Sequence, residues 1–189
     1  LAEFLRTDHG HLRALEPDSA VAQELKMLTR DHQRLGRHKT RLVNQIRITL
    51  KEYYPRALEV FEDLETTIAL DFLKTYKTPQ ALAQITRRSW MRFATREHRL
   101  GEARAKELWD KVNPPQLAVP EHVVRAKAKL LLALVVQLEA SIKAVDRYDE
   151  EVQSFFAAMP AAELAKTLPG GKSGTTVATI WAGLGDAPS

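Results

Sequence analysis

The chain of 189 residues contains no cysteine. This absence excludes disulfides and thiolate metal sites, and a reducing compartment is the simplest setting. The longest apolar run, Leu130–Val136, is far shorter than the ~20 residues that a membrane-spanning helix needs. The first residues, with Glu3, Arg6 and Asp8, lack the apolar stretch of a secretion signal. We therefore expect a cytoplasmic protein with no membrane partner.

Glycine is scarce, with 8 residues, and no segment shows the sustained period-two alternation of a strand. Hydrophobic residues make up 44% of the chain and charged residues 28%, which excludes a disordered chain by composition. The sequence therefore predicts an all-α fold. The net charge of +4 permits a polyanionic partner without requiring one. Whether such a partner is expected therefore depends on whether the cations cluster.

Apolar heptad spacing predicts a long helix over residues 18–53, with Asp18 or Ser19 as its N-terminal cap. Ten positions from 21 to 53 alternate steps of four and three, and seven of them are apolar. His32 and Lys39 interrupt this seam, where a polar residue usually sets register or faces a partner. The pattern is typical of a helical hairpin or coiled coil.

A second long helix is predicted over residues 121–158, between Pro120 and Pro160. Nine of its ten heptad positions are apolar, so its seam is the stronger one. Together the two seams predict a long antiparallel hairpin, and a second copy of the chain could also close them.

A compact helical insertion is predicted between the two long helices. Thr78 followed by Pro79 is a helix start, with the threonine as cap. The short helices are predicted at Arg56–Asp63, Thr67–Tyr76, Pro79–Ile85, Ser89–His98 and Glu102–Val112. The predicted divisions of the chain are 1–16, 17–54, 55–119, 120–159 and 160–189.

Five cations recur on one face of the first long helix, at steps of four, four, three and four: Lys26, Arg30, Arg34, Arg37 and Arg41. They fall within an arc of about 80°, nearly opposite the apolar seam. A solvated helix face usually mixes charges of both signs, so this cationic stripe predicts contact with nucleic acid. The alternative is a solvated face whose cations pair with acids on a neighbouring helix.

The insertion carries a second basic cluster, in which four cations are predicted to share a helix face: Arg88, Arg92, Arg96 and Arg99. These cations also favour phosphate contact. Trp90 and Phe93 lie between them and could stack on a base, but we expect them to form the core of the insertion.

The remaining motifs point to no catalytic residue and no metal ligand in this chain. The spacing of Asp8, His9 and His11 fits no known metal site. Gly171-Lys172-Ser173 is similar to the end of a P-loop, but Lys166 stands where that motif requires glycine and no strand precedes it. No arrangement of serine or cysteine with histidine suggests a nucleophile.

Several stretches resemble one family of proteins: LAEFLRTD with LEPDS, ELKMLTRDHQRLGRHKTRLVNQIRITLKEYYP, TPQALAQIT, and LPG followed by a small-residue helix and LGD. The family is the DEDD-type bacterial insertion-sequence transposases, which have a RuvC-like catalytic domain and in which a structured bridge RNA can guide the choice of DNA. The resemblance covers nearly the whole chain, and ELKMLTRDHQRLGRHKTRLVNQI is its most specific part.

The resemblance implies a RuvC-like domain with four acidic ligands for Mg²⁺, then a long helical hairpin, then a domain with a serine nucleophile. Residues 1–16 would end a catalytic-domain helix, and 160–189 would start the C-terminal domain, with a helix-hairpin-helix-like unit. In the family the last acidic ligands lie a few residues before the LAEFLR-type helix, so Asp8 is downstream of them. The serine nucleophile lies well after the LGD, in a sequence context that neither Ser173 nor Ser189 matches. We expect no cofactor in this chain and Mg²⁺ in the catalytic domain.

The sequence therefore predicts the central nucleic-acid-binding and assembly segment of a DNA transposase. The expected partners are DNA, a structured guide RNA as a further candidate, and a second copy of the chain. The alternative function is a structural helical dimerisation module without nucleic-acid contact. A self-contained helical enzyme is disfavoured because no catalytic group is found.

Overall fold

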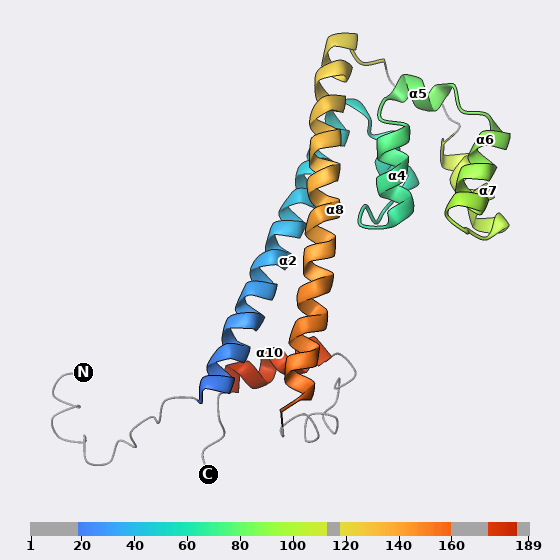
Figure 1. The fold of residues 1–189 in the computed structure, drawn as a ribbon. Coiled ribbons are helices and arrows are strands. Elements are labelled where there is room, and N and C mark those ends of the chain that lie inside the picture. The colour runs from blue at the N-terminus through green and yellow to red at the C-terminus, as the bar shows by residue number, and fades with distance from the viewer. Residues whose placement is uncertain (1–18, 113–117, 160–173, 185–189) are drawn as a thin grey trace, which may run out of the picture. The chain divides into compact units, whose positions relative to one another are not determined.

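Every regular element that the computed structural model describes is a helix, which confirms the all-α prediction (Figure 1). The described residues are 19–112, 118–159 and 174–184; the predictions for 1–16 and for the turn at 167–173 lie outside them. Two compact units are present: Leu1–His32 with Tyr148–Ser189, and Gln33–Arg147. None of the described helices is long and apolar enough to cross a membrane.

Two long helices, α2 (Ala20–Tyr53) and α8 (Glu121–Ala157), contribute to both units and match the spans predicted from the heptads to within two residues. The Ser19 hydroxyl oxygen accepts a hydrogen bond from the Ala22 N–H at 3.2 Å, so the predicted serine cap is present. It satisfies one of the backbone donors that the first turn of a helix leaves without a partner.

In the unit Gln33–Arg147, α2 and α8 pack on each other through their predicted seams (Figure 1). Leu42, Ile46 and Leu50 of α2 are buried in the same cluster as Leu131 and Leu138 of α8. An ion pair between Glu52 and Lys127 joins the end of α2 to the beginning of α8, as antiparallel packing requires. The seams therefore close within one chain in this unit.

The unit formed by Leu1–His32 and Tyr148–Ser189 has a smaller core. Leu25 of α2 and Val152 and Phe156 of α8 are buried with Val177 and Ala178 of α10 (Gly174–Leu184). The seam prediction was wrong at its first position, because Val21 is 48% exposed whereas Ala22 is buried. A strict heptad drifts around a straight α-helix, so its outermost position can leave the packed face.

Six short helices build the insertion of the larger unit: α3 (Arg56–Val60), α4 (Thr67–Thr75), α5 (Pro79–Ala83), α6 (Arg87–Met91), η2 (Arg92–Glu97) and α7 (Glu102–Val112). The Thr78 cap is confirmed, since its hydroxyl accepts from the Ala81 N–H at 3.1 Å. Helices α3 and α5 end two or three residues before the sequence predicted. The largest difference is the predicted helix Ser89–His98, which is two helices of different type.

The aromatic side chains of the insertion form its core, as predicted for Trp90 and Phe93. Trp90 is fully buried, and its Nε1–H donates to the Ala105 carbonyl at 2.8 Å. Its ring centroid lies 6.1 Å from that of Phe72 and 5.8 Å from that of Phe93. These contacts bring α4, α6, η2 and α7 together around one indole ring.

Residues Arg92–Glu97 form a π-helix, a type that the sequence did not predict. The His98 N–H bonds the Phe93 carbonyl at 3.2 Å, five residues back. An ordinary α-helix with Trp90, Phe93 and Ala94 on its buried face would turn Glu97 toward the core. The wider turn brings His98 there instead, with its ring centroid 4.6 Å from that of Phe93, and Glu97 stays exposed.

Two neighbouring tyrosines at the end of α2 allow a matched test of buried hydroxyl groups. Both rings are buried, which raises the pKa of each phenol above its usual range. The Tyr53 hydroxyl donates to the Lys77 carbonyl at 2.8 Å, whereas the Tyr54 hydroxyl has no hydrogen-bond partner among the described residues. The two hydroxyls should therefore contribute to stability with different signs.

We expect Tyr53→Phe to lower the free energy of unfolding by about 0.5–1.5 kcal/mol, because a made hydrogen bond is lost. Tyr54→Phe should be neutral or stabilising, because it removes a buried polar atom that lacks a partner. Urea titrations of both variants, followed by circular dichroism, check the difference. Equal losses in the two variants would contradict the hydrogen-bond assignment.

Candidate nucleic-acid interface

The cationic stripe of α2, defined above as Lys26, Arg30, Arg34, Arg37 and Arg41, lies on the side of the helix away from its buried residues. The four arginines are exposed and Lys26 is half-buried. The positions that α2 buries, such as Leu25 and Leu42, belong to the two cores. Packing of the seam therefore leaves the arginine guanidinium groups open to solvent.

Three of the five stripe residues differ from Lys39 and Arg47 of the same helix in their partners. Lys39 pairs with Glu65 Oε2 at 2.5 Å, and Arg47 donates to the Glu62 carbonyl at 2.7 Å. Among the residues that the structure describes, Arg30, Arg37 and Arg41 form no ion pair and no side-chain hydrogen bond, whereas Lys26 and Arg34 do have partners. The alternative of pairing with acids thus does not account for these three arginines.

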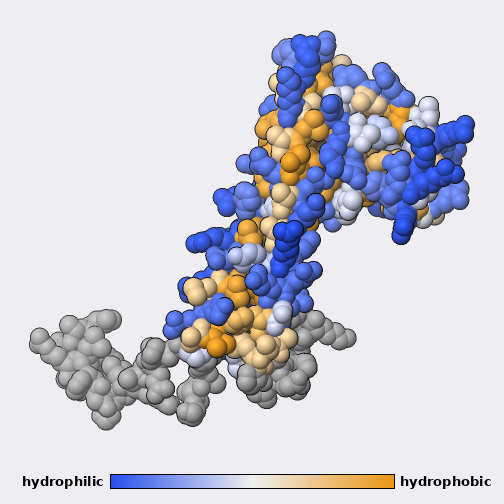
Figure 2. All heavy atoms as spheres, in the orientation of Figure 1, coloured by the Kyte–Doolittle hydropathy of each residue, from blue (hydrophilic) through white to orange (hydrophobic). Residues whose placement is uncertain are grey.

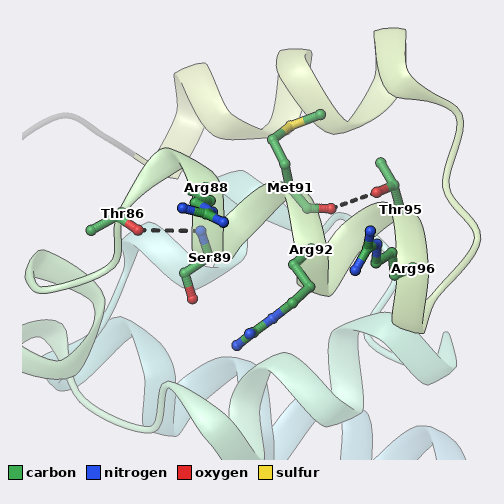
Figure 3. Close-up of a pocket in the computed structure, with 7 residues that line it drawn as sticks. All are labelled: Thr86, Arg88, Ser89, Met91, Arg92, Thr95 and Arg96. Carbon is green, nitrogen blue, oxygen red and sulfur yellow. Dashed lines mark hydrogen bonds between the residues drawn. The ribbon is translucent and has the colours of Figure 1, made fainter.

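The second basic cluster lies on α6 and η2, where three of its arginines line one hollow with a volume of about 470 Å³. The hollow is lined by Thr86, Arg88, Ser89, Met91, Arg92, Thr95 and Arg96 (Figure 3). Figure 2 shows a largely hydrophilic surface over this end of the insertion. The structure therefore brings together three of the four cations that the sequence grouped.

The fourth cation, Arg99, does not share the helix face that was predicted for it. Helix η2 ends at Glu97, and Arg99 follows in the left-handed region with a φ of 51°. A residue beyond the helix end no longer follows helical periodicity, and Arg99 does not line the hollow. The prediction of a shared face was wrong for this residue.

Basic residues of α7, which the sequence alone did not separate from those of α6 and η2, pair with acids on their own helix. Arg104 Nη1 lies 2.5 Å from Glu107 Oε1, and Lys106 Nζ lies 2.8 Å from Glu102 Oε1. Hydrogen bonds from these cations hold the pKa values of both carboxyls below their usual range. In the described ranges no ion pair is formed by Arg88, Arg92 or Arg96.

The hydroxyl groups around the hollow are interface candidates that the sequence reading missed. Thr86 caps α6, because its hydroxyl oxygen accepts from the Ser89 N–H at 3.2 Å. Thr95 donates to the Met91 carbonyl at 2.7 Å. A threonine is a typical N-cap, so the sequence could have indicated Thr86. It was missed because the helix was predicted to begin at Ser89.

One polar cluster of the smaller unit contains histidine, aspartate and threonine, yet it lacks the geometry of a catalytic triad. His32 Nε2 lies 3.1 Å from Asp149 Oδ1, and the Thr175 hydroxyl donates to that same oxygen at 2.7 Å. A nucleophilic hydroxyl must hydrogen-bond to the general base. Here the His32 imidazole and the Thr175 hydroxyl both contact the Asp149 carboxylate instead. His32 therefore acts as the predicted polar seam residue, with its partner on α8.

The described residues include no group of three or more histidine, cysteine, aspartate or glutamate side chains that could hold a metal ion. The described residues therefore do not fit a bound Mg²⁺ ion, which the family resemblance assigns to the RuvC-like catalytic domain.

Comparisons with known proteins find transposases. The family model described as a transposase, of the DEDD type of insertion sequence IS110, matches residues 1–55. The "Mini-circle putative transposase for IS117" of Streptomyces coelicolor is 32% identical over 180 residues, which cover 90% of this chain and 42% of that protein. "Putative transposase y4uE" of Sinorhizobium fredii is 35% identical over 85 residues, covering 45% of this chain and 24% of that protein. No solved structure matches the chain.

The chain thus spans less than half the length of the curated relatives that it matches. The matched relatives are both named as transposases, and the longer alignment extends over nearly all of α2, the insertion and α8. The chain belongs to the IS110-type family of insertion-sequence transposases.

Proposed function

We propose that this chain holds nucleic acid for an insertion-sequence transposase, with the cationic stripe of α2 lying along a row of phosphates. The observation that carries this proposal is the exposure of Arg30, Arg37 and Arg41 without an acidic partner in the described ranges. In each of the two units these arginines lie on the side of α2 away from its buried residues.

A row of cations on one helix face contributes substantially to the affinity for nucleic acid. Each phosphate that a cation neutralises releases condensed counterions, and this release supplies most of the sequence-independent affinity. An arginine that is already paired with a carboxylate must first give up that partner, so the unpaired arginines of the stripe bind at lower cost. Sequence-specific readout of bases is not part of this proposal.

For the whole protein we propose DNA strand cutting and rejoining, by a domain with Mg²⁺-bound carboxylates and a domain with a serine nucleophile. DNA is the substrate, a structured guide RNA is a further partner, and a second copy of the chain completes the assembly. The family resemblance supports these roles. The residues of α2, the insertion and α8 would then supply charge and scaffold rather than reacting groups.

The test is a salt titration of binding with the parent and with Arg30→Gln, Arg34→Gln, Arg37→Gln and Arg41→Gln combined. The log–log slope should become shallower by roughly three units, because each contact contributes about 0.9 for duplex DNA and about 0.7 for single strands. A matched control removes four exposed or half-buried cations that are paired with acids, at Arg104, Lys106, Lys111 and Arg125. That control has the same net charge and should keep most of the slope.

Circular dichroism should show the same helix content in all three proteins, because none of the substituted side chains is buried. A parent that binds neither DNA nor RNA at physiological salt would overturn the proposal. A slope that survives the four stripe substitutions would remove α2 from the interface.

The second candidate function, a structural dimerisation module, is favoured by apolar side chains on the outer face of α8. Leu130 is 45% exposed and Val136 is 59% exposed, although both lie on a helix whose seam is already packed. This function predicts a dimer in sedimentation and negligible affinity for nucleic acid.

A further inference from the structure

The charged residues that line the hollow on α6 and η2 are all arginines. Among the described residues that line it are Arg88, Arg92 and Arg96, and none of these described residues is acidic. In Figure 3, Arg92 lies between Arg88 and Arg96, and the Met91 side chain points away from that of Arg92. Three guanidinium groups around one hollow repel one another, and a bound anion relieves that repulsion.

A neighbouring hollow of about 450 Å³ provides an internal comparison. It shares Arg88 and Met91 with the first hollow, but it also contains Glu102 and Lys106. Glu102 pairs with Lys106 at 2.8 Å, so this second hollow already holds a carboxylate as its anion. The first hollow has the cations without the carboxylate, and it is therefore the one that suits an external anion.

The π-helix contributes to the arrangement of the three arginines. In an α-helix, side chains four residues apart drift by about 40° around the axis at each step. The wider turn of η2 rotates less per residue and so reduces the drift between Arg92 and Arg96. Single π-turns occur frequently at functional sites for this kind of reason.

Helices α6 and η2, which carry these arginines, pack against the core of the insertion with their opposite side. Trp90, Phe93 and Ala94 are buried on the opposite side of α6 and η2. His98, at the end of η2, lies with its Nε2 3.6 Å from Asp71 Oδ2 of α4. The backbone under the arginines is thereby fixed to the core, so a ligand need not order it on binding.

We infer that this hollow binds one backbone phosphate of a nucleic-acid strand, as a contact separate from the stripe of α2. The three guanidinium groups share that phosphate, and the Thr86 hydroxyl, whose oxygen already accepts from the Ser89 N–H, can donate its proton to it. The volume of about 470 Å³ exceeds that of a phosphate group, so one backbone phosphate fits in the hollow. This inference rests on the proposed function, because it requires that the chain binds nucleic acid.

A shared phosphate makes a numerical prediction that separate surface contacts do not make. Since the slope of the salt titration counts phosphates, combined Arg88→Gln, Arg92→Gln and Arg96→Gln should reduce it by about 0.9 with duplex DNA or about 0.7 with a single strand. Three independent contacts would reduce it by roughly two to three units. The single substitutions should also be non-additive, because each weakens the same site.

The matched control for this experiment is Arg104→Gln, Lys106→Gln and Lys111→Gln on α7, which removes the same number of charges from groups that pair with Glu102 and Glu107. It should leave the slope nearly unchanged. Triple Arg→Lys substitution at Arg88, Arg92 and Arg96 should keep the slope and lower the affinity, because lysine keeps the charge but loses the planar fork.

Arginine-specific modification with phenylglyoxal, read by mass spectrometry, gives a readout independent of affinity. Hairpin RNA or duplex DNA should protect Arg88, Arg92 and Arg96 together, whereas inorganic phosphate alone should protect them only at high concentration. Protection by inorganic phosphate without protection by either nucleic acid would overturn the inference.

The outcomes separate this inference from the proposed function. If the parent binds and the triple Gln variant keeps the parental slope, or loses two to three units, the shared-phosphate site is overturned while nucleic-acid binding stands. If the parent binds neither probe, both proposals fall. A loss of about one unit together with joint protection supports the site.

Discussion

Replacement of Trp90 by alanine is expected to lower the free energy of unfolding of the larger unit by about 3–5 kcal/mol. The indole is fully buried, it contacts the rings of Phe72 and Phe93, and its Nε1–H bond to the Ala105 carbonyl ties α6 to α7. Alanine would leave a cavity in the core of the insertion, where four helices meet. Because a domain is stable by only about 5–15 kcal/mol, the insertion could unfold at moderate temperature.

Urea titration followed by circular dichroism measures this loss, and two variants act as controls. Trp90→Phe keeps most of the ring and removes the hydrogen bond, so it should cost roughly 1–3 kcal/mol. Arg92→Ala changes an exposed side chain of the adjoining helix and should stay within about 0.5 kcal/mol of the parent. A Trp90→Ala variant as stable as the parent would show that the indole is not the centre of the insertion core.

Replacement of Leu131 by alanine is expected to cost about 2–5 kcal/mol, whereas the same change at Leu130 should cost less than about 0.5 kcal/mol. The two leucines are adjacent in α8, yet Leu131 is fully buried in the seam against α2 and Leu130 is 45% exposed. Helix propensity favours alanine slightly at both positions, so it cancels in the comparison. The difference in unfolding free energy therefore reports the seam alone.

The same pair of variants tests the assembly of the chain. If Leu130→Ala costs as much as Leu131→Ala, the outer face of α8 must be buried in solution. Repeating both titrations at several protein concentrations would then identify a second copy as the cover, because the stability of a dimer rises with concentration. A cost at Leu130 that does not depend on concentration would argue against self-association through this face.

The sequence by itself determined the long helices of this protein and the side on which each is buried. Periodicity and terminal prolines are local signals, so α2 and α8 begin and end within two residues of their predicted positions. The Ser19 and Thr78 caps are local for the same reason, since each bond spans three residues. The cationic stripe also follows from spacing alone, although its contact with nucleic acid remains a prediction.

Only the tertiary structure decided the shape of the second basic cluster. A π-turn has no clear mark in the sequence, because it forms when an extra residue lets Phe93, Ala94 and His98 all reach one core. Because the π-helix ends at Glu97, Arg99 lies outside the helix. Arg88, Arg92 and Arg96 lie together around one hollow. Periodicity assumes one constant rotation per residue, and packing of distant aromatic rings changed that rotation here. Likewise, the pairing of Lys39 with Glu65 depends on chain segments that the fold, not their spacing, brings together.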